Sequence, residues 1–117
     1  MSKINIKVSI KNNEKEEQYE TIAIIQDNIL KYQEKDNTIV IFNYDENTLT
    51  RENNELLLKY RYSDISEGTI YIKELDREIK VNIKTIKLER KENDIKINFM
   101  IENNIFLYEI EEIKWVY

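Results

Sequence analysis

Apolar residues occupy every second position over long stretches of the chain, and polar residues fill the positions between them. The clearest examples lie within residues 4–10, 79–83 and 95–101. A period of two places the apolar side chains on one face of a sheet and the polar ones in water. Two windows, residues 14–25 and 51–60, are rich in helix formers, but neither has a capping box or apolar spacings of three and four. We therefore predict strands throughout.

Turn residues break this alternation at regular intervals. With almost no Gly or Pro available, the turns must rest on Asn and Asp, whose short side chains bond to the local backbone and tolerate left-handed conformations. Nine candidate turns separate ten segments: Asn12-Asn13, Asp27-Asn28, Asp36-Asn37, residues 45–47, Asn53-Asn54, residues 64–68, Asp76-Arg77, Asn93-Asp94 and Asn103-Asn104. The pattern predicts one all-β domain over residues 1–117, an antiparallel up-and-down barrel of about eight to ten strands, with a two-sheet sandwich as the alternative.

Three features depart from simple alternation. The apolar positions change parity after Ile83, to Ile86 and Leu88, which predicts a β-bulge near Thr85. Residues 105–110 are apolar on both parities, which is typical of a strand covered on both faces. Residues 113–117 alternate again, so we expect the chain to end in a strand paired with the sheet.

The composition excludes the commonest catalytic sites. The chain contains no His, Cys or Pro and a single Gly. These absences exclude zinc fingers, His-based nucleophile systems and iron–sulfur clusters, and one glycine cannot build a phosphate-binding loop or a dinucleotide fingerprint. The acidic clusters lack the spacing of a calcium loop. We expect no catalytic activity, no cofactor and no bound metal.

The charge pattern argues against nucleic acid and the apolar pattern against a membrane. The net charge is −5, and the lysines recur singly among Asp and Glu, so a phosphate backbone would meet no basic patch. Purely apolar runs reach only four residues, as in residues 39–42, where a helical span needs about twenty. No export signal precedes the first alternating segment, so we expect a cytoplasmic protein.

Closure of many short strands leaves an interior that is either filled by side chains or open to one small apolar ligand. Among the eight tyrosines, Tyr44, Tyr60, Tyr62 and Tyr71 are the candidates for lining such a cavity, because each combines apolar area with a hydroxyl group. Strict alternation directs Tyr60 and Tyr62 inward and Arg61 outward. In the shifted register Arg61 points inside, as a candidate anchor for an anionic ligand group. We expect binding of a small apolar or amphipathic molecule.

Trp115 suggests a second function. It is the only tryptophan, close to the end of the chain, and it either plugs one end of the barrel or contacts a partner subunit. The alternative function is therefore a protein–protein interaction module or a homodimer whose barrel core is filled.

The order of segments resembles the YwiB-like family of small bacterial β-barrel proteins. The resemblance rests on the opening hairpin IKVSIKNNEKEEQYETIAI, the strand ending in Tyr44, Asp45 and Glu46, Arg61 at the end of a middle strand, and EIKVNIKTIKLERKENDIKINFMIE with Thr85. It implies a calycin-type, lipocalin-like barrel without an established activity. The chain departs from the family where relatives carry glycines after the middle arginine, because Ser63 and asparagines stand there, and it lacks the N-terminal Trp of the lipocalin motif.

Overall fold

The computed structural model describes residues 2–114, which form ten strands in one antiparallel sheet that closes on itself. The strands are β1 (Ser2–Lys11), β2 (Glu16–Gln26), β3 (Ile29–Gln33), β4 (Ile39–Asn43), β5 (Thr48–Glu52), β6 (Leu56–Arg61), β7 (Ser66–Ile72), β8 (Arg77–Lys91), β9 (Asp94–Ile101) and β10 (Asn104–Glu112). Each strand pairs with its sequence neighbours, and β1 pairs with both β2 and β10. The predicted up-and-down barrel is confirmed, with ten strands and a closed sheet in place of the sandwich alternative.

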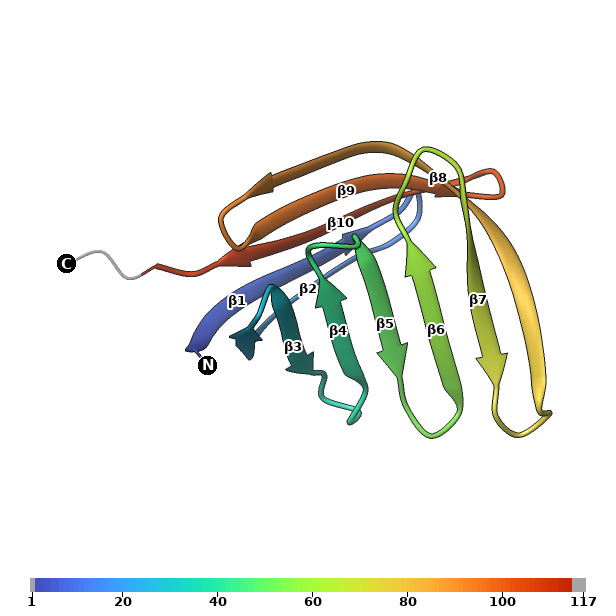
Figure 1. Ribbon diagram of the computed structural model, residues 1–117, viewed down its shortest axis with the longest axis horizontal. Helices are drawn as coiled ribbons and strands as arrows, with labels where there is room; N and C mark the ends of the chain where they lie inside the picture. The colour runs from blue at the N-terminus through green and yellow to red at the C-terminus, as the bar shows by residue number, and fades with distance from the viewer. Residues whose placement is uncertain (1, 115–117) are drawn as a thin grey trace.

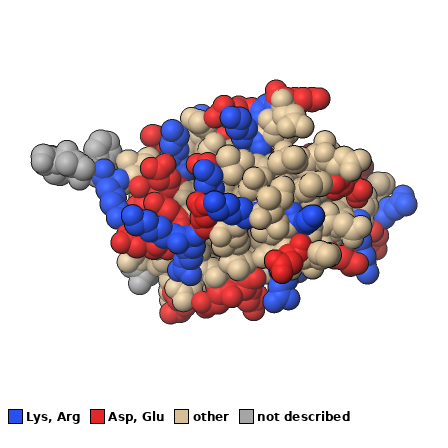
Figure 2. Space-filling model, turned by 90° about the horizontal axis from the view of Figure 1, so that it is seen from above, with Lys and Arg blue, Asp and Glu red and all other residues tan. Residues whose placement is uncertain are grey.

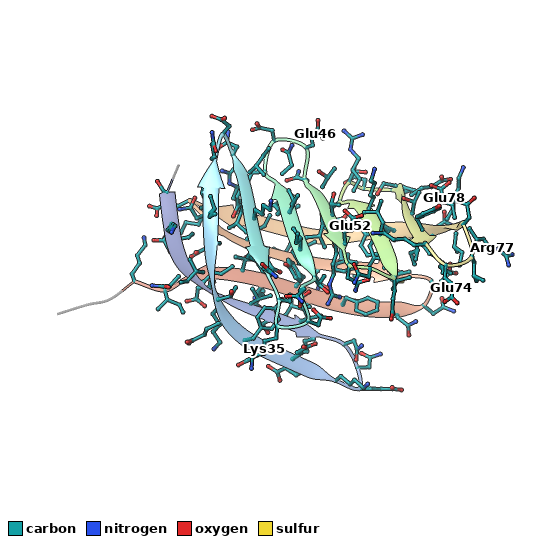
Figure 3. The ribbon with its side chains drawn as sticks, turned by 90° about the horizontal axis from the view of Figure 1, so that it is seen from below. Lys35, Glu46, Glu52, Glu74, Arg77 and Glu78 are labelled. Carbon is teal, nitrogen blue, oxygen red and sulfur yellow. The ribbon has the colours of Figure 1, made fainter. Side chains whose placement is uncertain are left out.

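The strands differ in length, and this difference shapes the barrel. In Figure 1 the long strands run across the view: β8, β9, β10, β1 and β2. The short strands β3 to β7 lie at a steep angle to them. Figure 3 shows the same crossing from below. The overall extents of 49 × 30 × 30 Å reflect this elongated form. Neither helix-rich window forms a helix, and residues 2–114 contain no helix suited to spanning a membrane.

Asparagine and aspartate build most of the turns, as the sequence predicts. The side-chain Oδ1 of Asn12 accepts hydrogen bonds from the backbone N–H groups of Glu14 and Lys15 at 2.9 and 2.8 Å. Asn43 and Asn53 hold their turns in the same way. Asp27 and Asn28 both have positive φ, as a two-residue hairpin turn requires. Local side-chain bonds therefore replace glycine at these positions.

Some predicted boundaries are wrong by a few residues. The turns before β9 and β10 lie at residues 92–93 and 102–103, where Glu92 and Glu102 adopt positive φ. Gly68 lies inside β7 and not in a turn. The strand predicted for residues 113–117 is not formed by Ile113 or Lys114, and residues 115–117 lie outside the described part of the chain.

The structure confirms the predicted bulge in β8 but not the prediction that β10 is covered on both faces. The pairing of β8 with β9 shifts between Thr85 and Lys87, so the predicted bulge is confirmed. The expectation that β10 is covered on both faces is wrong, because Ile105 remains 44% exposed on the outer side. Only the inward side of β10 contributes to the core, through Phe106, Tyr108 and Ile110.

Candidate functional site

Half of the barrel interior is filled. Fully buried side chains pack the half that lies beside the β2–β3, β4–β5 and β8–β9 turns: Ile6, Val8, Leu30, Phe42, Ile95, Ile97 and Ile110. At the same end, the Tyr44 hydroxyl donates a hydrogen bond to the backbone carbonyl of Asn93 at 2.7 Å, and the guanidinium of Arg90 lies 4.3 Å from the centre of the Tyr44 ring. These contacts tie the β4–β5 turn to the β8–β9 turn. Tyr44 therefore helps to close this end.

The other half of the interior contains a cavity of about 190 Å³. It lies toward the β1–β2, β3–β4 and β5–β6 turns. Most of its lining is aliphatic or aromatic: Ile10, Val40, Leu49, Leu58, Tyr60, Tyr62, Phe99, Ile101 and Phe106. The rings of Phe99 and Phe106 stack with centroids 5.4 Å apart, and the Tyr62 ring packs against Phe99 at 4.8 Å. The cavity therefore has an apolar wall of well-packed rings.

Three tyrosine hydroxyl groups lie together in the cavity lining. The Tyr32 hydroxyl forms a hydrogen bond with the Tyr108 hydroxyl and lies 3.3 Å from the Tyr19 hydroxyl. Burial raises the pKa of each of these tyrosines far above its usual value, and the charge of Glu34 adds to the rise. The three groups therefore stay neutral, and each one both donates and accepts hydrogen bonds.

An ion pair completes the lining. Arg51 Nε donates to Glu34 Oε1 at 2.7 Å, and a second guanidinium nitrogen lies 2.7 Å from the same oxygen. The Glu34 side chain is 10% exposed and that of Arg51 39%. Burial lowers the pKa of Arg51, but the adjacent Glu34 carboxylate outweighs this effect and the net pKa is raised. The arginine is therefore charged and paired.

The cavity meets the surface between β2 and the β3–β4 turn. β2 pairs with β3 only from Ala23 to Gln26, so the first half of β2 diverges from β3. A surface cleft of about 370 Å³ occupies this gap, lined by residues 17–21, residues 33–36 and Arg51. Figure 3 shows Lys35 on the β3–β4 turn beside β2. Tyr19, Glu34 and Arg51 line both the cleft and the cavity, so they mark the entrance.

The structure brings together two of the residues singled out from the sequence. Tyr60 and Tyr62 line the cavity, and burial raises the pKa of both. Tyr44 lies at the opposite end, where burial raises its pKa to about 12 against the opposing charge of Arg90. Arg61 is exposed, as strict alternation expects, and Tyr71 faces outward with its hydroxyl donating to Asp76. Trp115 lies outside the described residues.

The alternating pattern alone does not distinguish the polar residues of the cavity from other inward positions. These residues are Tyr19, Tyr32, Glu34, Arg51 and Tyr108. A signal was present, because Arg51 stands two positions after Leu49 in β5, and Glu34, directly after the end of β3, stands two positions after Tyr32, so both continue the inward parity. A charged residue at an inward position must be paired or must face a cavity. Among residues 2–114, no group of three or more carboxylates is placed to hold a metal ion.

Comparison with known proteins supports the fold. No family model and no curated protein matches the chain. The crystal structure of the ywiB protein from Bacillus subtilis is similar, with a TM-score of 0.56 and 14% identity over 96% of this chain and 91% of that chain. The similarity covers nearly all of both proteins. It is consistent with the resemblance to YwiB-like proteins noted from the sequence, and at this identity it concerns the fold.

Proposed function

We propose that the protein is a non-enzymatic barrel that binds one small apolar or amphipathic molecule in its interior. The observation that carries the proposal is the cavity of about 190 Å³, which has an apolar wall and a polar group of hydroxyls at one side. Ligand sites commonly combine a mostly apolar lining with a few polar groups that orient the ligand. The connection to the surface cleft at Tyr19, Glu34 and Arg51 supplies a route of entry.

The size of the cavity limits the ligand. An apolar cavity of about 150 Å³ in another protein is large enough for benzene. The cavity here is about 190 Å³, which suits one ring with a short substituent, or an aliphatic chain of similar volume. Sites for drug-sized molecules start at about 300 Å³. A ligand larger than a substituted ring would have to extend into the cleft beside Lys35.

Toluene is the probe for this proposal. Toluene binding is measured from amide chemical shifts of the ¹⁵N-labelled protein, and native mass spectrometry of freshly purified protein tests for a co-purifying molecule. Leu58 lines the cavity, whereas its neighbour Leu57 has the opposite parity on β6. Leu58→Trp should fill part of the cavity and weaken toluene binding at least about tenfold, because it removes apolar volume open to the ligand.

Leu57→Trp is the matched control, with the same substitution on the outer face. We expect it to bind toluene as the wild type does, with shifts confined to the cavity residues. The proposal is wrong if toluene causes no saturable shifts around the cavity, or if the two tryptophan variants weaken binding equally.

The outer surface supports a second candidate, a homodimer. Ile86 on β8 and Ile105 on β10 are 47% and 44% exposed, and Met100 of β9 pairs with Ile105. Figure 2 shows an uncharged area among interleaved charges on the upper face. Exposed apolar area of this kind is typical of a contact surface.

Sedimentation velocity over a concentration series tests the dimer. Ile105→Lys should shift a dimer to monomer, and a wild type that is monomeric throughout the series contradicts this candidate.

A further inference from the structure

We infer that the cavity selects a ligand with an uncharged, hydrogen-bonding head group, such as an alcohol, a phenol or an amide, over a carboxylate or an ammonium group of equal size. This inference rests on the proposed function and adds the chemical class of the ligand.

The charges that line the cavity already cancel each other. Both nitrogens of Arg51 that contact Glu34 lie 2.7 Å from its Oε1, and no other charged residue lines the cavity within residues 2–114. A charged ligand therefore brings a net charge into a site whose lining is mostly apolar. The charged head group loses its water of hydration, and the cavity lining offers it no opposite charge that is not already paired. Burial of an uncompensated charge is strongly unfavourable.

The tyrosine hydroxyls offer what a neutral polar group needs. Tyr19, Tyr32 and Tyr108 are held in the protonated form by burial, so they present hydroxyl groups and no phenolate. A hydroxyl or amide of the ligand can exchange hydrogen bonds with such groups in either direction. An ammonium group donates only and a carboxylate accepts only, so each would use half of this capacity.

The entrance adds a bias against anions. The cleft outside the cavity is lined by Glu17, Glu20 and Asp36 with a single additional lysine, Lys35, besides the Glu34–Arg51 pair. An approaching carboxylate meets this acidic rim before it reaches Arg51. An ammonium group is attracted to the rim, but the charge of the Glu34 carboxylate in the cavity lining is already paired with Arg51. We therefore expect ammonium ligands to remain at the cleft.

The test compares four probes of one ring size at pH 7: toluene, benzyl alcohol, benzoate and benzylammonium. Dissociation constants come from amide chemical-shift titrations, which also report where each probe binds. We expect benzyl alcohol to bind in the cavity at least about tenfold more tightly than either ion, since each ion loses hydration without a partner. Equal or tighter cavity binding of benzoate or benzylammonium overturns the inference but leaves the proposed function standing. Failure of all four probes overturns both.

A charge-switch variant gives a second readout. Glu34→Gln keeps the side-chain size and leaves the Arg51 charge uncompensated, so benzoate should gain at least about tenfold in affinity relative to the wild type. Glu52→Gln is the matched control, because Glu52 pairs with Lys73 on the outer surface and its side chain is 49% exposed. No gain for benzoate in folded Glu34→Gln, or an equal gain in both variants, contradicts the inference. If Glu34→Gln does not fold, the wild-type probe series decides by itself.

Discussion

The single glycine of the chain occupies a position where there is no space for a side chain. Gly68 lies in the middle of β7 and does not have positive φ, so its backbone does not require glycine. A Cβ at this position would lie 2.5 Å from Tyr60 Cδ1 and 2.7 Å from Ile83 Cδ1. Ile83 is a buried core residue, and Tyr60 forms part of the cavity wall. Gly68→Ala therefore forces one or both of these side chains to move.

The expected loss of stability follows from two opposing effects. Insertion of a methyl group into a packed core costs about 1–3 kcal/mol. Replacement of glycine by alanine recovers about 0.4–1 kcal/mol, because the unfolded chain has fewer conformations to lose. The middle of the two ranges leaves a net loss of about 1.3 kcal/mol for Gly68→Ala, which for a domain of this size lowers Tm by about 5 °C. Urea denaturation followed by circular dichroism measures this loss.

A double variant separates the clash from other effects. Valine lacks the Cδ1 atom of Ile83, so Ile83→Val should make Gly68→Ala less costly by about 0.5 kcal/mol or more. Displacement of the Tyr60 ring into the cavity should also weaken toluene binding by the single variant. The reasoning fails if Gly68→Ala unfolds within about 0.5 kcal/mol of the wild type, or if the two substitutions are additive.

Three further predictions concern buried hydroxyl groups. Tyr32→Phe removes a hydroxyl that bonds to two others and should lower the free energy of unfolding, measured in urea, by about 1–3 kcal/mol. Tyr71→Phe, at an outward tyrosine, should lower it by less than about 0.5 kcal/mol, and equal losses would contradict the buried network. Burial raises the pKa of Tyr32, Tyr62 and Tyr108, so above pH 10 the unfolded chain releases protons that the folded protein keeps. The free energy of unfolding should therefore fall by about 1 kcal/mol per tyrosine between pH 10 and 11, and a constant urea midpoint over that range would refute this. Thr85 Oγ1 is buried with no hydrogen-bond partner among the described residues, so Thr85→Val should raise the thermal stability by about 1 kcal/mol, and a loss of similar size would show that the hydroxyl is bonded.

The sequence by itself determined the strands and most of their turns. Alternation separates an apolar face from a polar one along each strand, and it depends only on neighbouring residues. Ile6, Val8 and Ile97, which alternation directs inward, are buried in the structure. The bulge near Thr85 was visible as a change of parity for the same reason. Strict alternation favoured the outward direction that Arg61 has in the structure, although a shifted register remained open in the sequence. Each of these features depends on near neighbours in the chain.

Only the tertiary structure decided where the interior is empty and which polar groups share it. Tyr32 and Tyr108 are 76 positions apart in the sequence, and Glu34 and Arg51 come from two different strand ends. Their contact depends on how the short strands β3 to β5 cross the long strands β10, β1 and β2, which no local pattern encodes. The same crossing leaves β2 and β3 apart near Tyr19, which opens the entrance. Alternation directs a side chain inward, but the strand crossing determines whether it meets a packed core or a cavity.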